Sequence, residues 1–300
     1  MIVSYGFAIL AAVSNAGSNV LQRKANSEEP PERSFSLRLI WDLVHSKAWW
    51  LGIGFVTSSF LFQAVALGTG ELAAVQPIIV FELPLTMVAG KLFLGSEMHL
   101  REWGAIALLT AGLGGLVGFL DPHGGTSSAS IVKWLAGAGG TALLIAVAVV
   151  AGLKHRGQVR AGLFGAAAGV TFGLTAAFMK STTGEVSRGL GDLFTSWQPY
   201  AMMAAGALGL FLVQNALQAG RLVAAQPGIS LLDPFTSIAW GVIVFDERAN
   251  GGLFLVLAGL SATAMAAGAV LLSSSPVLQR SQQAGSPRED ERVSPTPGDP

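Results

Sequence analysis

The sequence predicts an all-α, polytopic membrane protein with about nine transmembrane helices in two inverted repeats. Three observations favour this fold class. Half of the residues are hydrophobic (51%) and only 12% are charged, whereas soluble domains carry about 25% charged residues. Apolar runs of about 20 residues, the length that crosses a bilayer, recur along the chain. A segment with two prolines is also echoed later in the sequence, which indicates an internal repeat.

The apolar runs define nine candidate spans. The first has no basic residues ahead of it, so we expect a retained helix and not a cleaved signal peptide. The nine runs are Val3–Leu21, Trp49–Leu67, Leu72–Gly95, Trp103–Leu120, Ile131–Leu153, Ala161–Met179, Tyr200–Ala219, Leu222–Phe245 and Leu253–Leu272.

Two segments outside the spans have a different character. Residues 35–46 place apolar side chains at helical spacing with Arg38 and Asp42 between them, which is typical of an amphipathic helix in the membrane interface. Residues 274–300 are rich in Ser, Pro and charge, so we expect a disordered tail. The predicted organisation is a first repeat over 1–122, a linking helix within 123–160, a second repeat over 161–273, and the tail.

Lys and Arg residues gather in alternate loops, which predicts the orientation. Cytoplasmic loops are enriched in these residues, and the pattern favours an outside N-terminus and a cytoplasmic C-terminus in the plasma or inner membrane. Basic and acidic residues balance at 18 each, so nothing attracts nucleic acid, and the absence of cysteine excludes thiolate chemistry. No nucleophile or metalloenzyme motif occurs, so we expect neither an enzyme nor a cofactor.

The internal repeat is clearest between two segments rich in alanine and leucine. "ALGTGELAAVQPIIVFELP" (66–84) aligns with "ALQAGRLVAAQPGISLLDP" (216–234). Five spans precede the second copy, so it crosses the membrane in the opposite sense, as in many secondary transporters. The shared positions include Gln76 with Gln226, Pro77 with Pro227, Pro84 with Pro234 and, further on, Glu97 with Glu247; Lys24 and Lys180 end a second, weaker match.

These segments resemble the drug/metabolite transporter superfamily, in which a proline-containing helix ends in an acidic residue and is followed by another helix. Here the pattern is "AAVQPIIVFELPLTMVAGKLFLGSE" with "WGAIALLTAGLGGLVG", and "AAQPGISLLDPFTSIAWGVIVFDE" with "FLVLAGLSATAMAAGAVLL". The nine-helix layout, "AVSNAGSNVLQRKA" and "KAWWLGIGF" are similar to the NIPA branch of magnesium transporters. The resemblance covers residues 3–272 and implies Mg²⁺ as the substrate.

Two carboxylates, Glu82 and Asp233, lie deep in predicted spans. A charge at that depth costs about 3 kcal/mol or more and usually faces a cavity or a partner. Two hard oxygen ligands suit a partly hydrated Mg²⁺ or another small cation. A protonatable pair suits proton-coupled exchange equally well, and a structural role that only holds helices together stays open.

Other polar residues are secondary candidates. Amides within the spans can contact a substrate or join helices, and the prolines kink helices and free carbonyls. The charges at helix ends suggest capping or gating, with the lysines extending toward the interface. The amides are Gln76, Gln226, Gln63, Gln214, Asn15 and Asn19; the helix-shaping prolines are Pro77, Pro84, Pro227 and Pro234; the gating residues are Glu97, Glu247, Lys24 and Lys180.

The sequence thus predicts a secondary transporter that moves Mg²⁺ or another small cation by alternating access. A proton-coupled exporter of small organic metabolites or drugs is the alternative within transport. A membrane scaffold that transports nothing is the alternative from another class. The expected partners are the lipid bilayer and the small cation or small-molecule substrate, and we leave monomer and homodimer open.

Overall fold

The computed structural model describes residues 2–27, 47–94, 98–186, 189–220 and 222–275, and over these residues the fold is all-helical without a strand. Its helices are α1 (Ile2–Ser27), α3 (Lys47–Thr69), α4 (Leu72–Ile79), α5 (Glu82–Leu94), α6 (Leu100–Leu120), α7 (Ile131–Lys154), α8 (Gly157–Val186), α9 (Leu190–Thr195), α10 (Gln198–Ala219), α11 (Leu222–Ile243) and α12 (Leu253–Ser273).

Seven spans within the described residues are long and apolar enough to cross a membrane, so the chain has the character of a multi-pass membrane protein. They are α3, α4 together with α5, α6, α7, α8, α10 and α12. The predicted count of nine is not reached, because α1 and α11 are not among them. Both are nevertheless long helices of the same bundle, with 26 and 22 residues.

Two details differ from the sequence prediction. The expected single helix over Leu72–Gly95 is wrong, since the chain forms α4 and α5 with a break at Val80 and Phe81. A short helix, α9, which is not among the nine predicted spans, also occurs between α8 and α10.

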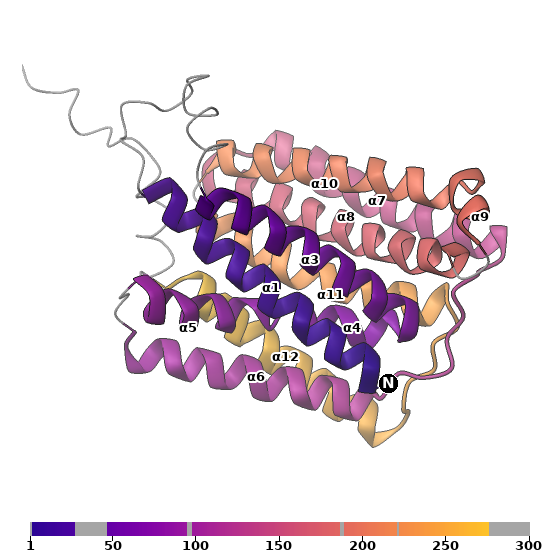
Figure 1. Ribbon diagram of the computed structural model, residues 1–300, viewed down its shortest axis with the longest axis horizontal. Coiled ribbons are helices and arrows are strands. Elements are labelled where there is room, and N and C mark those ends of the chain that lie inside the picture. Colours follow the sequence, from indigo (N-terminus) through magenta and orange to yellow (C-terminus); the bar gives the residue numbers. More distant parts are fainter. Residues whose placement is uncertain (1, 28–46, 95–97, 187–188, 221, 276–300) are drawn as a thin grey trace, which may run out of the picture.

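The helices pack in pairs (Figure 1). α6 and α12 lie side by side along one edge of the bundle, and α8 with α7 and α10 forms the opposite edge. α1 packs on α3 and on the broken pair α4 and α5, while α11 packs along α8 and against α4. The proline-containing segments of the two predicted repeats therefore meet in the middle of the bundle.

Glycine allows the closest of these contacts, because small residues let membrane helices approach each other closely. Gly165 and Gly169 of α8 face backbone oxygens of α11, and a methyl group at either position would collide with them. Gly112 of α6 lies in the same way against the backbone of Met265 in α12. Small residues thus set the distance between α8 and α11 and between α6 and α12.

Several predictions concern residues outside the described ranges. The interfacial helix over 35–46, nearly all of the 274–300 tail and Glu97 fall there. Lys24 belongs to α1, but its side chain is not described.

Candidate functional site

The break between α4 and α5 places Glu82 at the start of a helix in the middle of a span. The amides of Val80 and Phe81 bond to the carbonyls of Pro77 and Ile78, three residues back, in place of the usual four. Pro84 has no amide proton for the Val80 carbonyl, which accepts the amide of Leu83 instead. Since a helix N-terminus favours a negative charge, the break supports a carboxylate in the first turn of α5.

Glu82 meets polar groups from two other helices. The side-chain amide of Asn15, on α1, hydrogen-bonds to the Glu82 carboxylate. Asp233, on α11, lies near enough for the two carboxylates to interact electrostatically. The Ser237 hydroxyl, one turn along α11, donates to Asp233 at 3.4 Å. The two acids therefore interact with each other and with polar side chains of α1 and α11, and we refer to Glu82, Asp233, Asn15 and Ser237 as the acid cluster.

No cation neutralises this cluster among the described residues. The ion pairs in that part of the chain join His99 with Glu102, Lys133 with Asp246, and Lys180 with Glu247. Glu82 and Asp233 are both partly exposed and not sealed from contact. A pair of acids without a basic partner can take up a cation or protons.

Metal binding at this cluster would need ligands other than carboxylates and histidines. Within the described residues, no group of three or more His, Cys, Asp or Glu side chains is placed to hold a metal ion. The oxygens of Asn15 and Ser237 lie beside the two acids, and oxygen atoms with retained waters are what Mg²⁺ accepts. The donor set suits a hard, hydrated cation and does not suit a soft transition metal.

Two buried polar atoms near the acids lack a hydrogen-bond partner in the described structure. They are Nε2 of Gln76, whose side chain is 2% exposed, and Oγ1 of Thr86, one turn after Glu82 on α5. Buried polar groups are nearly always paired with protein or water, so unpaired ones call for a water or a ligand. Gln226, the repeat counterpart of Gln76, instead donates to Ser230 at 3.1 Å.

The remaining predicted amides do not join this cluster. Gln214 and Asn19 are exposed on the outside of α10 and α1, so our prediction that they face the substrate does not fit their placement. Gln63 is half-buried in α3 and makes no hydrogen bond to either acid within the described residues. A cleft of about 720 Å³ between α1 and α3 includes Ser14 and Ser58 but neither acid.

A second polar centre lies at the end of the bundle where α4 begins. The Lys180 ammonium is 2.9 Å from Oε1 of Glu247 and donates to the Gly70 carbonyl at 2.7 Å. Glu247 also accepts the backbone amides of Leu72 at 2.6 Å and Ala73 at 2.9 Å. We expected Lys180 to extend to the interface and Glu247 to be exposed; both expectations are wrong, since they are 4% and 2% exposed.

The loop after α11 is shaped to bring Glu247 to this position. Asp246 takes a left-handed conformation (φ 56°), and the Glu247 amide returns to the Gly241 carbonyl. A methyl group at Gly125 or Gly241 would run into the Glu247 side chain, so glycine at both positions makes room for it. Glu71, which precedes α4, makes no side-chain cap of its own. The carboxylate that caps α4 comes from the other half of the chain.

Sequence reasoning missed three features of these centres. Thr86 and Ser237 escaped notice because hydroxyls are common in membrane helices, although each stands four residues after an acid. The pairing of Lys180 with Glu247 was missed because 67 positions separate them and neither repeat copy predicts it.

Comparison with known proteins gives one relative. An uncharacterized protein of Corynebacterium glutamicum is 25% identical to this chain over 248 residues, which cover 81% of the chain and 84% of the relative. No protein-family model matches the chain, and no solved structure matches it. The likeness spans most of both sequences, so it extends over the helical bundle as a whole.

Proposed function

We propose that the protein is a secondary membrane transporter whose cargo binds at Glu82 and Asp233. The observation that carries this proposal is the meeting of two intramembrane carboxyls from α5 and α11 without a basic partner in the described structure. Acids within a membrane are costly and mark substrate or ion pathways. The broken helix at Glu82 adds support, because interrupted helices form the binding sites of many transporters.

The packing of the helices supports an inverted repeat and alternating access. α1 packs with α3 and with α4 and α5, and their repeat counterparts α8, α10 and α11 pack among themselves in the same way. Two further pairs join repeat counterparts, α4 with α11 and α6 with α12. This pairing is what two halves related by an approximate two-fold axis in the membrane plane would give. It accords with membership of the drug/metabolite transporter superfamily, and the distribution of Lys and Arg in the sequence supports an outside N-terminus.

The cargo that fits the cluster best is a small hard cation such as Mg²⁺. Two carboxylates supply the charge, and the Asn15 and Ser237 oxygens, the Thr86 hydroxyl and retained waters complete an oxygen shell. The NIPA-like layout of the sequence points to the same ion.

One observation favours the alternative of proton-coupled exchange of an organic solute. Glu82 and Asp233 each accept a hydrogen bond from a neutral side chain and interact with each other. Two such neighbouring acids readily share a proton, which can be released to drive the movement of a solute.

Flux measurements in proteoliposomes test both. With an Mg²⁺-sensitive dye inside, we expect uptake that falls at least about ten-fold in Glu82→Gln and Asp233→Asn, the factor given by about 1.4 kcal/mol. Asp246→Asn, which alters an exposed carboxylate, is the matched control and should retain uptake. Uptake unchanged in both acid variants would exclude the cation site. Absent Mg²⁺ uptake with solute-driven internal pH changes would favour proton-coupled exchange.

A further inference from the structure

We propose that Lys180 and Glu247 form a lock that closes one end of the transport path and opens during each cycle. The inference rests on the proposed function and adds a gate to the same path. The end concerned is where α4 begins, and it is the outer end in the predicted orientation.

The hydrogen bonds that the lock makes to the backbone join the two halves of the chain, while the ion pair itself lies within the second half. Glu247 and Lys180 come from the second half, and they hold the amides of Leu72 and Ala73 and the carbonyl of Gly70 in the first. The first amides of a helix have no partner within it, and the helix dipole favours a carboxylate there. The lock therefore depends on where α4 begins, and displacing α4 breaks all of these bonds together.

A buried ion pair is better suited to switching than to stability. Desolvation opposes the attraction between the charges, so apolar residues often stabilise the same position equally well or better. The lock makes its hydrogen bonds only in one arrangement of the halves, because the Leu72 and Ala73 amides point along α4. A carboxylate that caps a helix of the opposite half thus favours one closed arrangement over others.

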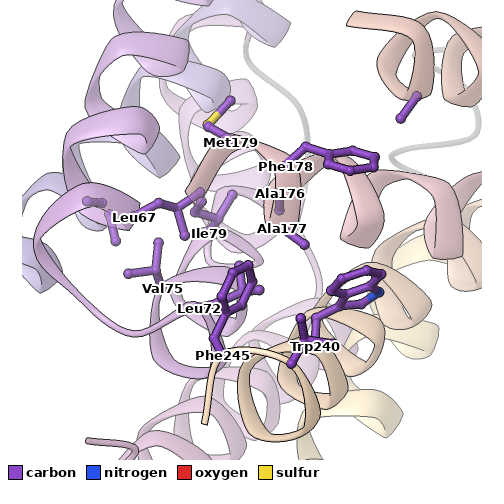
Figure 2. Close-up of a cluster of buried hydrophobic side chains, with 14 of the residues drawn as sticks. Leu67, Leu72, Val75, Ile79, Ala176, Ala177, Phe178, Met179, Trp240 and Phe245 are labelled. Atoms are coloured by element: carbon purple, nitrogen blue, oxygen red, sulfur yellow. The ribbon is translucent and has the colours of Figure 1, made fainter. Parts of the chain in front are cut away.

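An apolar layer is the second part of the proposed closure, and Figure 2 shows the buried side chains that form it. Leu72, Val75 and Ile79 of α4 gather with Trp240 of α11 and with Phe245. α4 extends about 12 Å from the lock, at 1.5 Å per residue over its eight residues, and Glu82 follows beyond the break at its far end. The ammonium of Lys180 also lies 5.8 Å from the centre of the Phe245 ring. In the proposed closed arrangement, the lock and the apolar layer block the path between this end and the acids.

The break after α4 supplies the moving part. α4 has eight residues and ends at Ile79, before the irregular turn at Val80 and Phe81. A short helix next to such a turn can tilt without displacing α5, so opening need not disturb Glu82. The opening movement we infer is a tilt of α4 away from Glu247.

Cysteine accessibility tests the lock directly, because the chain has no cysteine. Ile79→Cys places a thiol in the apolar layer, and a membrane-impermeant maleimide is applied to the Lys180 side of oriented vesicles without cargo. We expect slow labelling in the parent. Glu247→Gln and Lys180→Met should each raise the rate about ten-fold, which corresponds to a shift of about 1.4 kcal/mol toward the open arrangement.

Matched controls separate the lock from a general loss of structure. Lys133→Met removes an exposed ion pair with Asp246 at the same end and should leave the labelling rate unchanged. Leu109→Cys, fully buried in the seam between α6 and α12, should remain unlabelled in every lock variant that is folded. If the thiol of Leu109→Cys is labelled in the Glu247→Gln background, that variant has lost its fold, and Gly241→Ala replaces it in the experiment. A methyl group at Gly241 displaces the Glu247 carboxylate without removing its charge.

A charge exchange examines the capping role. Lys180→Glu combined with Glu247→Lys restores opposite charges but puts an ammonium at the amides of Leu72 and Ala73, so labelling should stay fast. A return to the slow parent rate would overturn the capping lock, and unchanged labelling in Glu247→Gln and Lys180→Met would overturn the gate altogether. Labelling needs no cargo, so a failure of the lock is distinguishable from a failure of transport.

Discussion

Glu247 accepts the backbone amide of Leu72 at 2.6 Å, across 175 positions of sequence. The carboxylate that caps the broken helix of one half is thus donated by the loop after the corresponding helix of the other. This contact and the Glu82 and Asp233 cluster both join polar groups of the two halves inside the bundle. The predictions below test what each contributes.

Removal of the Glu247 charge should lower stability strongly. Glu247→Gln leaves the Lys180 ammonium and the α4 amides buried without their anion, and breaking one partner of a buried pair costs about 3 to 5 kcal/mol. Asp246→Asn, at the neighbouring position, breaks the exposed ion pair with Lys133. The loss of such a pair should lower the free energy of unfolding by only about 0 to 1 kcal/mol. Unfolding curves in detergent measure both. Equal losses for the two variants would contradict the buried role of Glu247.

The seam between α8 and α11 should resist added volume. Gly169→Ala places a methyl group against the Gly228 and Ile229 carbonyls and should lower stability by about 1 to 3 kcal/mol. Gly140→Ala on α7 meets nothing within 4 Å, so it should be neutral or slightly stabilising, because alanine favours helix over glycine. The thermal unfolding midpoints of the two variants, measured in one series, test this prediction. A lower midpoint for Gly140→Ala than for Gly169→Ala would mean that the seam does not control packing.

The structure distinguishes two asparagines that stand one turn apart on α1. Asn15→Leu removes the hydrogen bond to Glu82 and should reduce flux, because the carboxylate loses the group that orients it. Asn19→Leu changes an exposed side chain and should leave flux unchanged. Initial uptake rates in proteoliposomes compare them. Equal effects would argue against Asn15 as a positioning residue.

Gln76 should show opposite effects on stability and function. Its unpaired amide is buried, and removing an unsatisfied polar group is neutral or stabilising. Gln76→Leu should therefore retain or raise the unfolding midpoint while flux falls, if the amide binds cargo or its water. Gln214→Leu, exposed on α10, should change neither. A lowered midpoint with normal flux would assign Gln76 to structure alone.

Much of the bundle follows from hydrophobicity, because apolar runs long enough to cross a bilayer have few alternatives to helix. The prolines were harder to interpret. Pro77 and Pro84 have the same spacing as Pro227 and Pro234, yet the first pair flanks a break while α11 remains continuous. Local sequence indicates that a helix is weakened, and packing decides whether it breaks.

The two polar centres differ in how far sequence could predict them. Depth in an apolar run singles out Glu82 and Asp233, and the packing of α11 against α4 brings their segments together. Glu247 and Lys180 stand near helix ends, where a charge is normally solvated, so only the three-dimensional structure reveals their burial. A contact that depends on a long-range chain reversal, here at Asp246, has no periodic signal in the sequence.

A double-mutant cycle of Glu82→Gln and Asp233→Asn tests the central claim, that the two acids form one cargo site. The measured quantity is the Mg²⁺-induced rise in unfolding midpoint, since a ligand bound to the folded protein stabilises it. If both acids hold one ion, each single variant should abolish most of the rise and the double variant should lose little more. Independent, additive losses, or a full rise in the double variant, would contradict a shared site.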